Sequence, residues 1–217
     1  MSTTRPKVVQ LALEKPPWHE EMEASLLEAL KSTADLQEIT TAAEASKLFN
    51  GNAKPVVLAI DQALSEKKHD RLRAEAVNFV KNGGTIIFGC HFPSFVTPPN
   101  IDKLFSAFSL PWQMSEYNRT EFNVNGAMEQ INTSGLVPRY SQKAVQLKKV
   151  PRSDAVYLPD ASSYTQSMVF PAAPIADLTL TPAAFGASGQ GKVGYLGDVN
   201  AEAATTHVVL AMCGLSG

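Results

Sequence analysis

The sequence predicts a three-layer α/β domain built on a mostly parallel sheet. Strand-like and helix-like segments alternate through the first half of the chain, and the same alternation returns near its end. The segment 55–60, PVVLAI, is continuously apolar, which is typical of a strand covered on both faces. Alternating elements of this length imply parallel strands joined by right-handed crossovers, and therefore a doubly wound sheet.

The first two strand–helix units are marked by their apolar spacing and by the residues that end them. The segment 7–13 is β-branched and apolar, and two prolines break it. Apolar residues at helical spacing predict a helix over 19–31. A second strand is predicted over 36–40. The helix that follows, over 42–49, ends at an Asn-Gly pair, which is a helix-stop signal.

The next two units lead to the most informative segment of the chain. The apolar strand 55–60 ends at Asp61 and precedes a predicted helix over 64–80. Two glycines then turn the chain into a short apolar strand over 85–88. Several prolines follow this strand, and a further helix is predicted over 101–108.

The second half of the chain is less regular. Between residues 110 and 182 there are seven prolines and no long helical period, with weak strand patterns at 119–124, 144–150 and 155–158. We interpret this region as an irregular β-rich insertion, roughly 110–182, within one domain that spans residues 1–217. The parallel pattern returns with a strand over 192–196 and a helix over 201–213, which stops at Gly214.

Composition excludes several classes of function. The net charge is −2, and no basic patch emerges among 19 basic and 21 acidic side chains, so nucleic acid is not an expected partner. The apolar run near the N-terminus is too short for a signal or a membrane span, which favours a cytosolic protein without a membrane partner. The two cysteines do not make a disulfide framework.

The strand 85–88 delivers Gly89, Cys90 and His91 to its carboxyl end. In open α/β sheets, ligands bind just outside the carboxyl ends of the strands. Two interpretations of Cys90 follow. It is either a nucleophile or a small buried residue at a strand end, where free cysteine is common.

Several motifs together resemble the class I glutamine amidotransferase-like superfamily, and within it the ThuA-like proteins. The residues that carry this resemblance are His19, 56–61, the helix ending FVKNGG, Gly89-Cys90-His91 and GKVGYLGD at 191–198. The resemblance covers roughly 7–108 and 182–214 and implies a flavodoxin-like sheet. The segments YSQKAV and YLGDVNAE also resemble a group of fungal proteins, which implies no activity.

The resemblance implies a cysteine on a strained strand-to-helix turn, with backbone N–H groups forming an oxyanion hole. In this sequence the backbone N–H of His91 or Phe92 would form the oxyanion hole. Two features depart from the pattern. Phe92 stands where a small residue is expected, and no histidine occupies the late strand end. A catalytic role for Cys90 therefore needs His91 or His19 as its base.

Acidic and amide side chains provide a predicted ligand-binding set at the same edge. Asp61 ends the third strand, while Asp198, Asn200 and Glu202 cluster where the last strand passes into the last helix. With Gly89 they make up the predicted set. A competing interpretation assigns Asn200 to the helix N-cap and Glu202 to the positive end of the helix dipole.

No cofactor, metal or nucleotide site is predicted. The candidate ligands lack metal-ligand spacing. The sequence GQGKVG at 189–194 matches G-x-G-x-x-G but precedes a strand, whereas the dinucleotide fingerprint follows one. The aromatic residues Phe105, Phe108, Trp112 and Tyr117 are expected in the core, with a homodimer edge as the alternative.

Two functional hypotheses follow. In the first, the chain is a degenerate ThuA-like domain that binds a small molecule or a protein without the Cys-His-Glu triad. In the second, it is a cysteine-dependent hydrolase or amidotransferase-like enzyme that acts on a small amide or ester through Cys90. The fold class does not decide between them.

Overall fold

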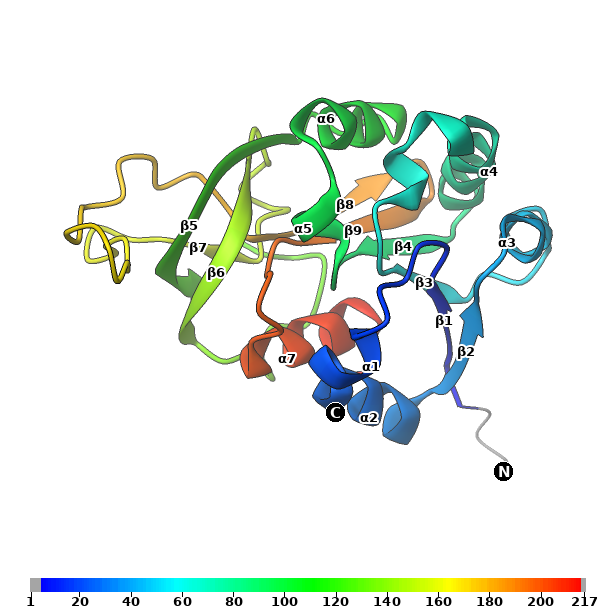
Figure 1. The fold of residues 1–217 in the computed structure, drawn as a ribbon, viewed down its shortest axis with the longest axis horizontal. Coiled ribbons are helices and arrows are strands. Elements are labelled where there is room, and N and C mark those ends of the chain that lie inside the picture. The colour runs from blue at the N-terminus through cyan, green and yellow to red at the C-terminus, as the bar shows by residue number, and fades with distance from the viewer. Residues whose placement is uncertain (1–4, 216–217) are drawn as a thin grey trace.

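The computed structural model describes residues 5–215 and contains two β-sheets (Figure 1). Sheet A has the strand order β2-β1-β3-β4-β9-β8, and all its pairs are parallel except β8 with β9. Its strands are β1 (Lys7–Leu11), β2 (Asp35–Ile39), β3 (Val56–Ala59), β4 (Thr85–Phe88), β8 (Ala183–Ser188) and β9 (Gly191–Leu196). The first five strands follow the flavodoxin order, so the three-layer α/β prediction is confirmed.

Helices cover both faces of sheet A, as Figure 1 shows. The α-helices are α1 (His19–Met22), α2 (Ala24–Thr33), α3 (Ala42–Phe49), α4 (Asp70–Lys81), α5 (Phe92–Phe95), α6 (Pro98–Ala107) and α7 (Ala203–Met212). One core contains the buried side chains of α3, α4 and α6, and the other contains those of α2 and α7. The central strands β3 and β4 are buried on both faces, which explains their continuous apolar sequence.

The insertion folds into sheet B, a three-stranded antiparallel sheet of β6 (Arg139–Lys148), β5 (Gln113–Val124) and β7 (Tyr157–Leu158). The predicted β-rich character of this region is confirmed, although β5 and β6 are longer than the weak patterns indicated. Single β-bridges join this region to β8, through Ala155 and Ala184, and to the segment that follows β9, through Ala144 and Asp198.

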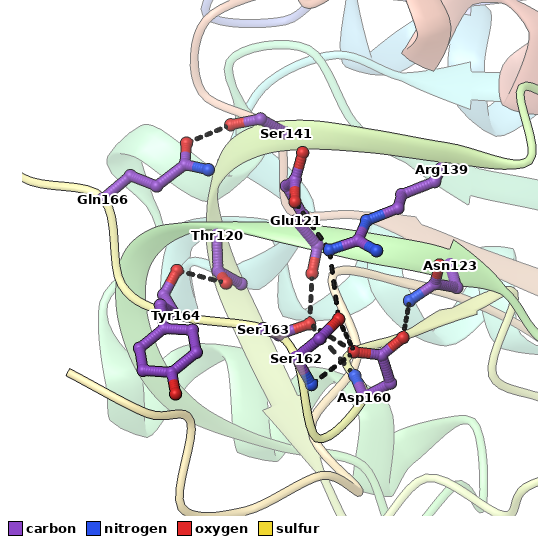
Figure 2. A network of polar contacts seen from close by, with 10 residues as sticks. All are labelled: Thr120, Glu121, Asn123, Arg139, Ser141, Asp160, Ser162, Ser163, Tyr164 and Gln166. Atoms are coloured by element: carbon purple, nitrogen blue, oxygen red, sulfur yellow. Dashed lines mark hydrogen bonds and ion pairs between the residues drawn. The ribbon is translucent and has the colours of Figure 1, made fainter. Parts of the chain in front are cut away.

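The segment after β7 is held on sheet B by a network of polar contacts (Figure 2). The Asp160 carboxylate accepts hydrogen bonds from the Ser162 backbone N–H and the Asn123 amide, at 2.8 and 2.9 Å. The Ser163 hydroxyl donates to the carbonyl of Glu121 at 2.9 Å, and the Thr120 hydroxyl donates to the carbonyl of Tyr164 at 2.8 Å. Short side chains with hydroxyl and amide groups thus fix a segment that has no regular structure.

Several elements differ from the predictions. The predicted helix over 64–80 begins only at Asp70, because two 3₁₀ turns, Ala63–Ser65 and Lys67–His69, precede it. The predicted helix over 19–31 is two helices that meet at Glu23. The predicted helix over 201–213 begins at Ala203. Gly214 follows that helix with a φ of +70°, as a helix-ending glycine should.

The aromatic residues considered for a dimer edge lie mostly in the core. Phe105, Phe108 and Trp112 are fully buried, and only Tyr117 is exposed. The core interpretation is therefore confirmed for three of these residues, and Tyr117 is the one that lies on the surface.

Within residues 5–215, every helix is too short or too polar to pass through a bilayer. The same residues contain no group of three or more acidic, histidine or cysteine side chains arranged to hold a metal ion.

We predict that Gly197 is essential for docking the insertion on sheet A. A Cβ atom at this position would clash with the carbonyl oxygen of Val145 in β6, so the backbone must shift. Gly197→Ala should lower the free energy of unfolding in urea by about 3 kcal/mol or more. Gly126→Ala is the control, since its Cβ would meet nothing within 4 Å. Equal stability of the two variants would contradict this account.

Candidate functional site

The turn between β4 and α5 places Cys90 in a strained conformation. Its φ is +55°, in the left-handed region that residues other than glycine rarely adopt. Nucleophilic residues occupy strained strand-to-helix turns of this kind in α/β-hydrolases. Gly89 precedes it, and a Cβ atom there would lie only 3.0 Å from the Leu196 side chain at the end of β9. Gly89 therefore allows the ends of β4 and β9 to pack closely.

Phe92 does not obstruct the turn, contrary to the expectation from its size. Its fully buried ring packs against Phe88 at a centroid distance of 5.0 Å and against Tyr195 at 6.2 Å. These rings belong to the core under α4 and α6, whereas Cys90 packs against the core under α2 and α7. The bulk of Phe92 and the side chain of Cys90 therefore lie on opposite faces of sheet A.

A cavity of about 40 Å³ lies beside Cys90, between the α1–α2 junction, the end of β9 and the start of α7. Its ionisable lining residues are Cys90, Glu23, Asp198 and Glu202. Glu23 lies at the break between α1 and α2, and it lines the same cavity as the Cys90 thiol. The structure thus brings together three of the predicted residues and adds Glu23, which the sequence analysis missed.

Asp198 organises the entry to α7. Its carboxylate accepts hydrogen bonds from the backbone N–H groups of Asn200 at 2.9 Å and Glu202 at 2.8 Å. It also accepts one from the Thr205 hydroxyl at 2.5 Å. The interpretation of Asn200 as the N-cap is wrong, because α7 begins at Ala203 and its N-cap residue is Glu202. Asp198 fixes the turn before the helix through the N–H groups of Asn200 and Glu202.

The insertion reaches this cavity through Arg119 of β5. Its guanidinium group pairs with the Glu202 carboxylate at 2.5 Å and donates to the Ser141 hydroxyl at 3.2 Å. Glu202 is therefore neutralised by a cation from sheet B. The position of the cavity wall depends on the docking of the insertion.

Burial disfavours negative charge in this cavity. Burial, with a smaller contribution from the charge of Asp198, raises the pKa of Glu23 to about 7. Burial also raises the pKa of Asp198. Burial and then the charges of Glu23 and Asp198 raise the pKa of the Cys90 thiol well above its ordinary value. The thiol is therefore protonated at neutral pH, whereas nucleophilic attack requires the thiolate.

The two candidate base residues lie together, but they do not contact the thiol. His91 Nε2 is 3.1 Å from His19 Nδ1, and His19 Nε2 is 3.3 Å from the Gln10 side-chain oxygen. Both imidazoles are buried. No hydrogen bond joins either ring to Cys90 in the described part of the chain. Successive residues at the end of β4 point in different directions, so Cys90 and His91 serve separate clusters.

The backbone groups considered for an oxyanion hole are already paired. The His91 N–H donates to the Ile60 carbonyl at 2.9 Å, and the Phe92 N–H donates to the Gly89 carbonyl at 3.0 Å. Asp61 also has a local role. Its carboxylate accepts from the N–H groups of Glu14 at 2.7 Å and Ala63 at 3.1 Å, which ties two loops together. Asp61 does not line the Cys90 cavity.

The position of Glu23 in the helical pattern could have identified it from the sequence. It stands three, four and seven residues before the leucines at 26, 27 and 30, and therefore on the buried face of the predicted helix. A carboxylate on an apolar helix face is rarely buried without a partner. A glutamate on the apolar face of the predicted helix was therefore the sequence feature that indicated a buried carboxylate.

No family model and no curated protein matches the sequence. Solved structures do match. A ThuA-like protein from Bacteroides uniformis has a TM-score of 0.59 over 98% of this chain and 91% of its own length, at 12% identity. A ThuA-like protein from Parabacteroides merdae has a TM-score of 0.54 over 99% of this chain and 90% of its own, at 8% identity. The chain therefore has a ThuA-like fold.

A β-galactosidase from Bacillus circulans also matches, with a TM-score of 0.55 and 13% identity. The match covers 97% of this chain but only 31% of that enzyme, so the chain is similar to one part of a larger protein. At such identities the similarity concerns the fold alone.

We predict that the histidine pair makes the protein less stable in acid. Burial and the neighbouring His19 lower the pKa of His91 to about 4, from 6.5 in the unfolded chain. Between these values the unfolded state binds more protons, so the free energy of unfolding falls as the pH falls. Wild-type protein should lose about 2 kcal/mol more than His91→Gln between about pH 7.5 and pH 4.5.

The measurement is urea unfolding of both proteins across this range. The raised pKa values of the buried carboxyl groups act in the opposite direction, but they are common to both proteins and cancel in the difference. Between about pH 7.5 and 8.5 the difference should stay constant. If the free energies of unfolding of the two proteins change in parallel down to about pH 4.5, His91 is not buried in its neutral form.

Proposed function

We propose that this chain is a ThuA-like domain that binds a small molecule in the Cys90 cavity and does not use a Cys-His-Glu triad. The observation that carries the proposal is the environment of the thiol. Cys90 has the left-handed backbone conformation that is typical of nucleophilic residues. Its neighbours, however, are the carboxyl groups of Glu23 and Asp198 rather than an imidazole. Carboxylates beside a thiol oppose formation of the thiolate.

The oxyanion geometry supports the same conclusion. An acyl-transfer site needs N–H groups that are free to bind the developing negative charge. The N–H groups of His91 and Phe92 are both used by backbone carbonyls. A ligand in the cavity would instead meet the side chains of four elements, including α7, whose entry is fixed by Asp198.

The proposal also gives the insertion a role. Arg119 of β5 holds Glu202 at the cavity wall, so sheet B shapes the binding site without lining it. We include in the proposal a relation to the class I glutamine amidotransferase-like superfamily and a cytosolic location. Both rest on the sequence resemblance and composition described above.

The competing function is a cysteine-dependent hydrolase, and one observation favours it. The left-handed turn at Cys90 costs of order 1 kcal/mol, and nucleophilic residues commonly occupy such turns. The two functions differ in the reactivity of the thiol. An enzyme of this kind needs a thiol more reactive than a free one, and a binding site does not.

We predict that Cys90 reacts with iodoacetamide at least about tenfold more slowly than a free thiol at about pH 7.5, because the thiolate is disfavoured. The experiment uses a Cys213→Ser background, so that Cys90 is the only thiol. Glu23→Gln should increase the rate severalfold, since it removes the negative charge that, after burial, contributes most to the raised pKa of Cys90.

Glu21→Gln is the matched control, because Glu21 is an exposed residue of α1. In urea all variants should reach the rate of a free thiol. Alkylation of folded wild-type Cys90 faster than a free thiol would overturn the proposed function and support the hydrolase.

A further inference from the structure

We propose that the Cys90 cavity binds a small alkylammonium group, held by the Glu23 carboxylate. This inference rests on the proposed function, since it names the chemical class of the ligand for the same site. The ligand is either a small primary amine or a larger molecule with an aminomethyl end that enters the cavity.

The charge of the wall favours a cation. Three carboxyl groups line the cavity, and its lining contains no lysine, arginine or histidine among the described residues. The nearest cation, Arg119, is already paired with Glu202. An anionic ligand would therefore meet uncompensated negative charge at close range.

The hydrogen bonds of the three carboxyl groups single out Glu23. Asp198 accepts three hydrogen bonds at the start of α7, and Glu202 pairs with Arg119. Glu23 is only 6% exposed, and no basic side chain or N–H group donates to its carboxylate among the described residues. The Cys90 thiol beside it is only a weak donor. A buried carboxylate in this state lacks the cation that would offset its desolvation.

The size of the cavity limits the ligand. About 40 Å³ exceeds the roughly 10–15 Å³ that one water needs, but it admits only a few heavy atoms. A sugar ring does not fit, whereas an ammonium group with one or two carbons does. Met22, Leu26, Leu196 and Val209 supply apolar wall for the carbons. A metal ion is disfavoured, since no three ligating side chains converge in the described part of the chain.

Binding should displace a proton. In the empty cavity Glu23 has a pKa of about 7, so it is protonated in about half of the molecules at neutral pH. An alkylammonium ion requires the ionised carboxylate. The affinity should therefore rise about tenfold between pH 6 and pH 8, a range in which a primary amine remains charged.

The test is calorimetric titration of wild-type protein with methylammonium chloride at about pH 6, 7 and 8, at constant ionic strength. We expect saturable binding, an affinity that rises with pH, and proton release seen as a heat that depends on the buffer. Glu23→Gln should weaken binding at least tenfold, while the α1 control Glu21→Gln should leave it unchanged. Tetramethylammonium, which is too bulky, and sodium chloride should give no saturable heat.

The pH series on wild-type protein keeps the inference testable even if Glu23→Gln does not fold. Affinity independent of pH, or equal binding of tetramethylammonium, would overturn it. The inference also fails, with the proposed function intact, if methylammonium does not bind while a neutral molecule such as methanol or ethylene glycol binds saturably and slows Cys90 alkylation. Rapid alkylation of Cys90 in the folded protein would instead defeat the proposed function itself.

Discussion

The Asp198 carboxylate is the contact on which the site depends. It follows β9, the last parallel strand, and its three hydrogen bonds set where α7 begins. Its backbone forms a β-bridge with Ala144 of β6, and the next N–H, that of Val199, donates to the Lys143 carbonyl at 3.1 Å. The buried side chain of Asp198 therefore fixes the start of a covering helix, while the backbone of Asp198 and Val199 joins the end of the parallel sheet to the inserted sheet.

This arrangement explains why the site is acidic without being a catalytic triad. The chain reaches α7 through Ala201, whose φ is +53°, and this turn directs Glu202 toward Arg119. The charge of Asp198 remains in the cavity and opposes the ionisation of both Glu23 and Cys90. Burial and the charge of Glu23 are the main reasons that the thiol stays protonated, and the carboxylate that organises the backbone adds to their effect. A histidine in this position would have had the opposite effect on Cys90.

Sequence patterns predicted the fold better than the site, and particular residues show why. Continuous apolar runs identified β3 and β4, but β8 has the sequence AAFGAS and lacks the β-branched residues that mark a strand. Parallel strands bring their carboxyl ends to one edge, which correctly placed Cys90 near Asp198. The pattern does not say which way each side chain points. His91 and Asp61 therefore lie at the predicted edge but make other contacts, and the helix break that exposes Glu23 to the cavity has no signal in the apolar spacing.

The conformation of Cys90 and its chemistry are separable properties. A left-handed residue between a strand and a helix lifts its side chain away from the sheet, and this geometry is useful for any group that must face a cavity. Reactivity depends on what the cavity contains. In this chain the strained turn brings the thiol to a buried place beside Glu23, where burial and the negative charge of that carboxylate keep the proton on the thiol. The fold therefore provides a place for a ligand, and the charges around that place determine which ligands it accepts.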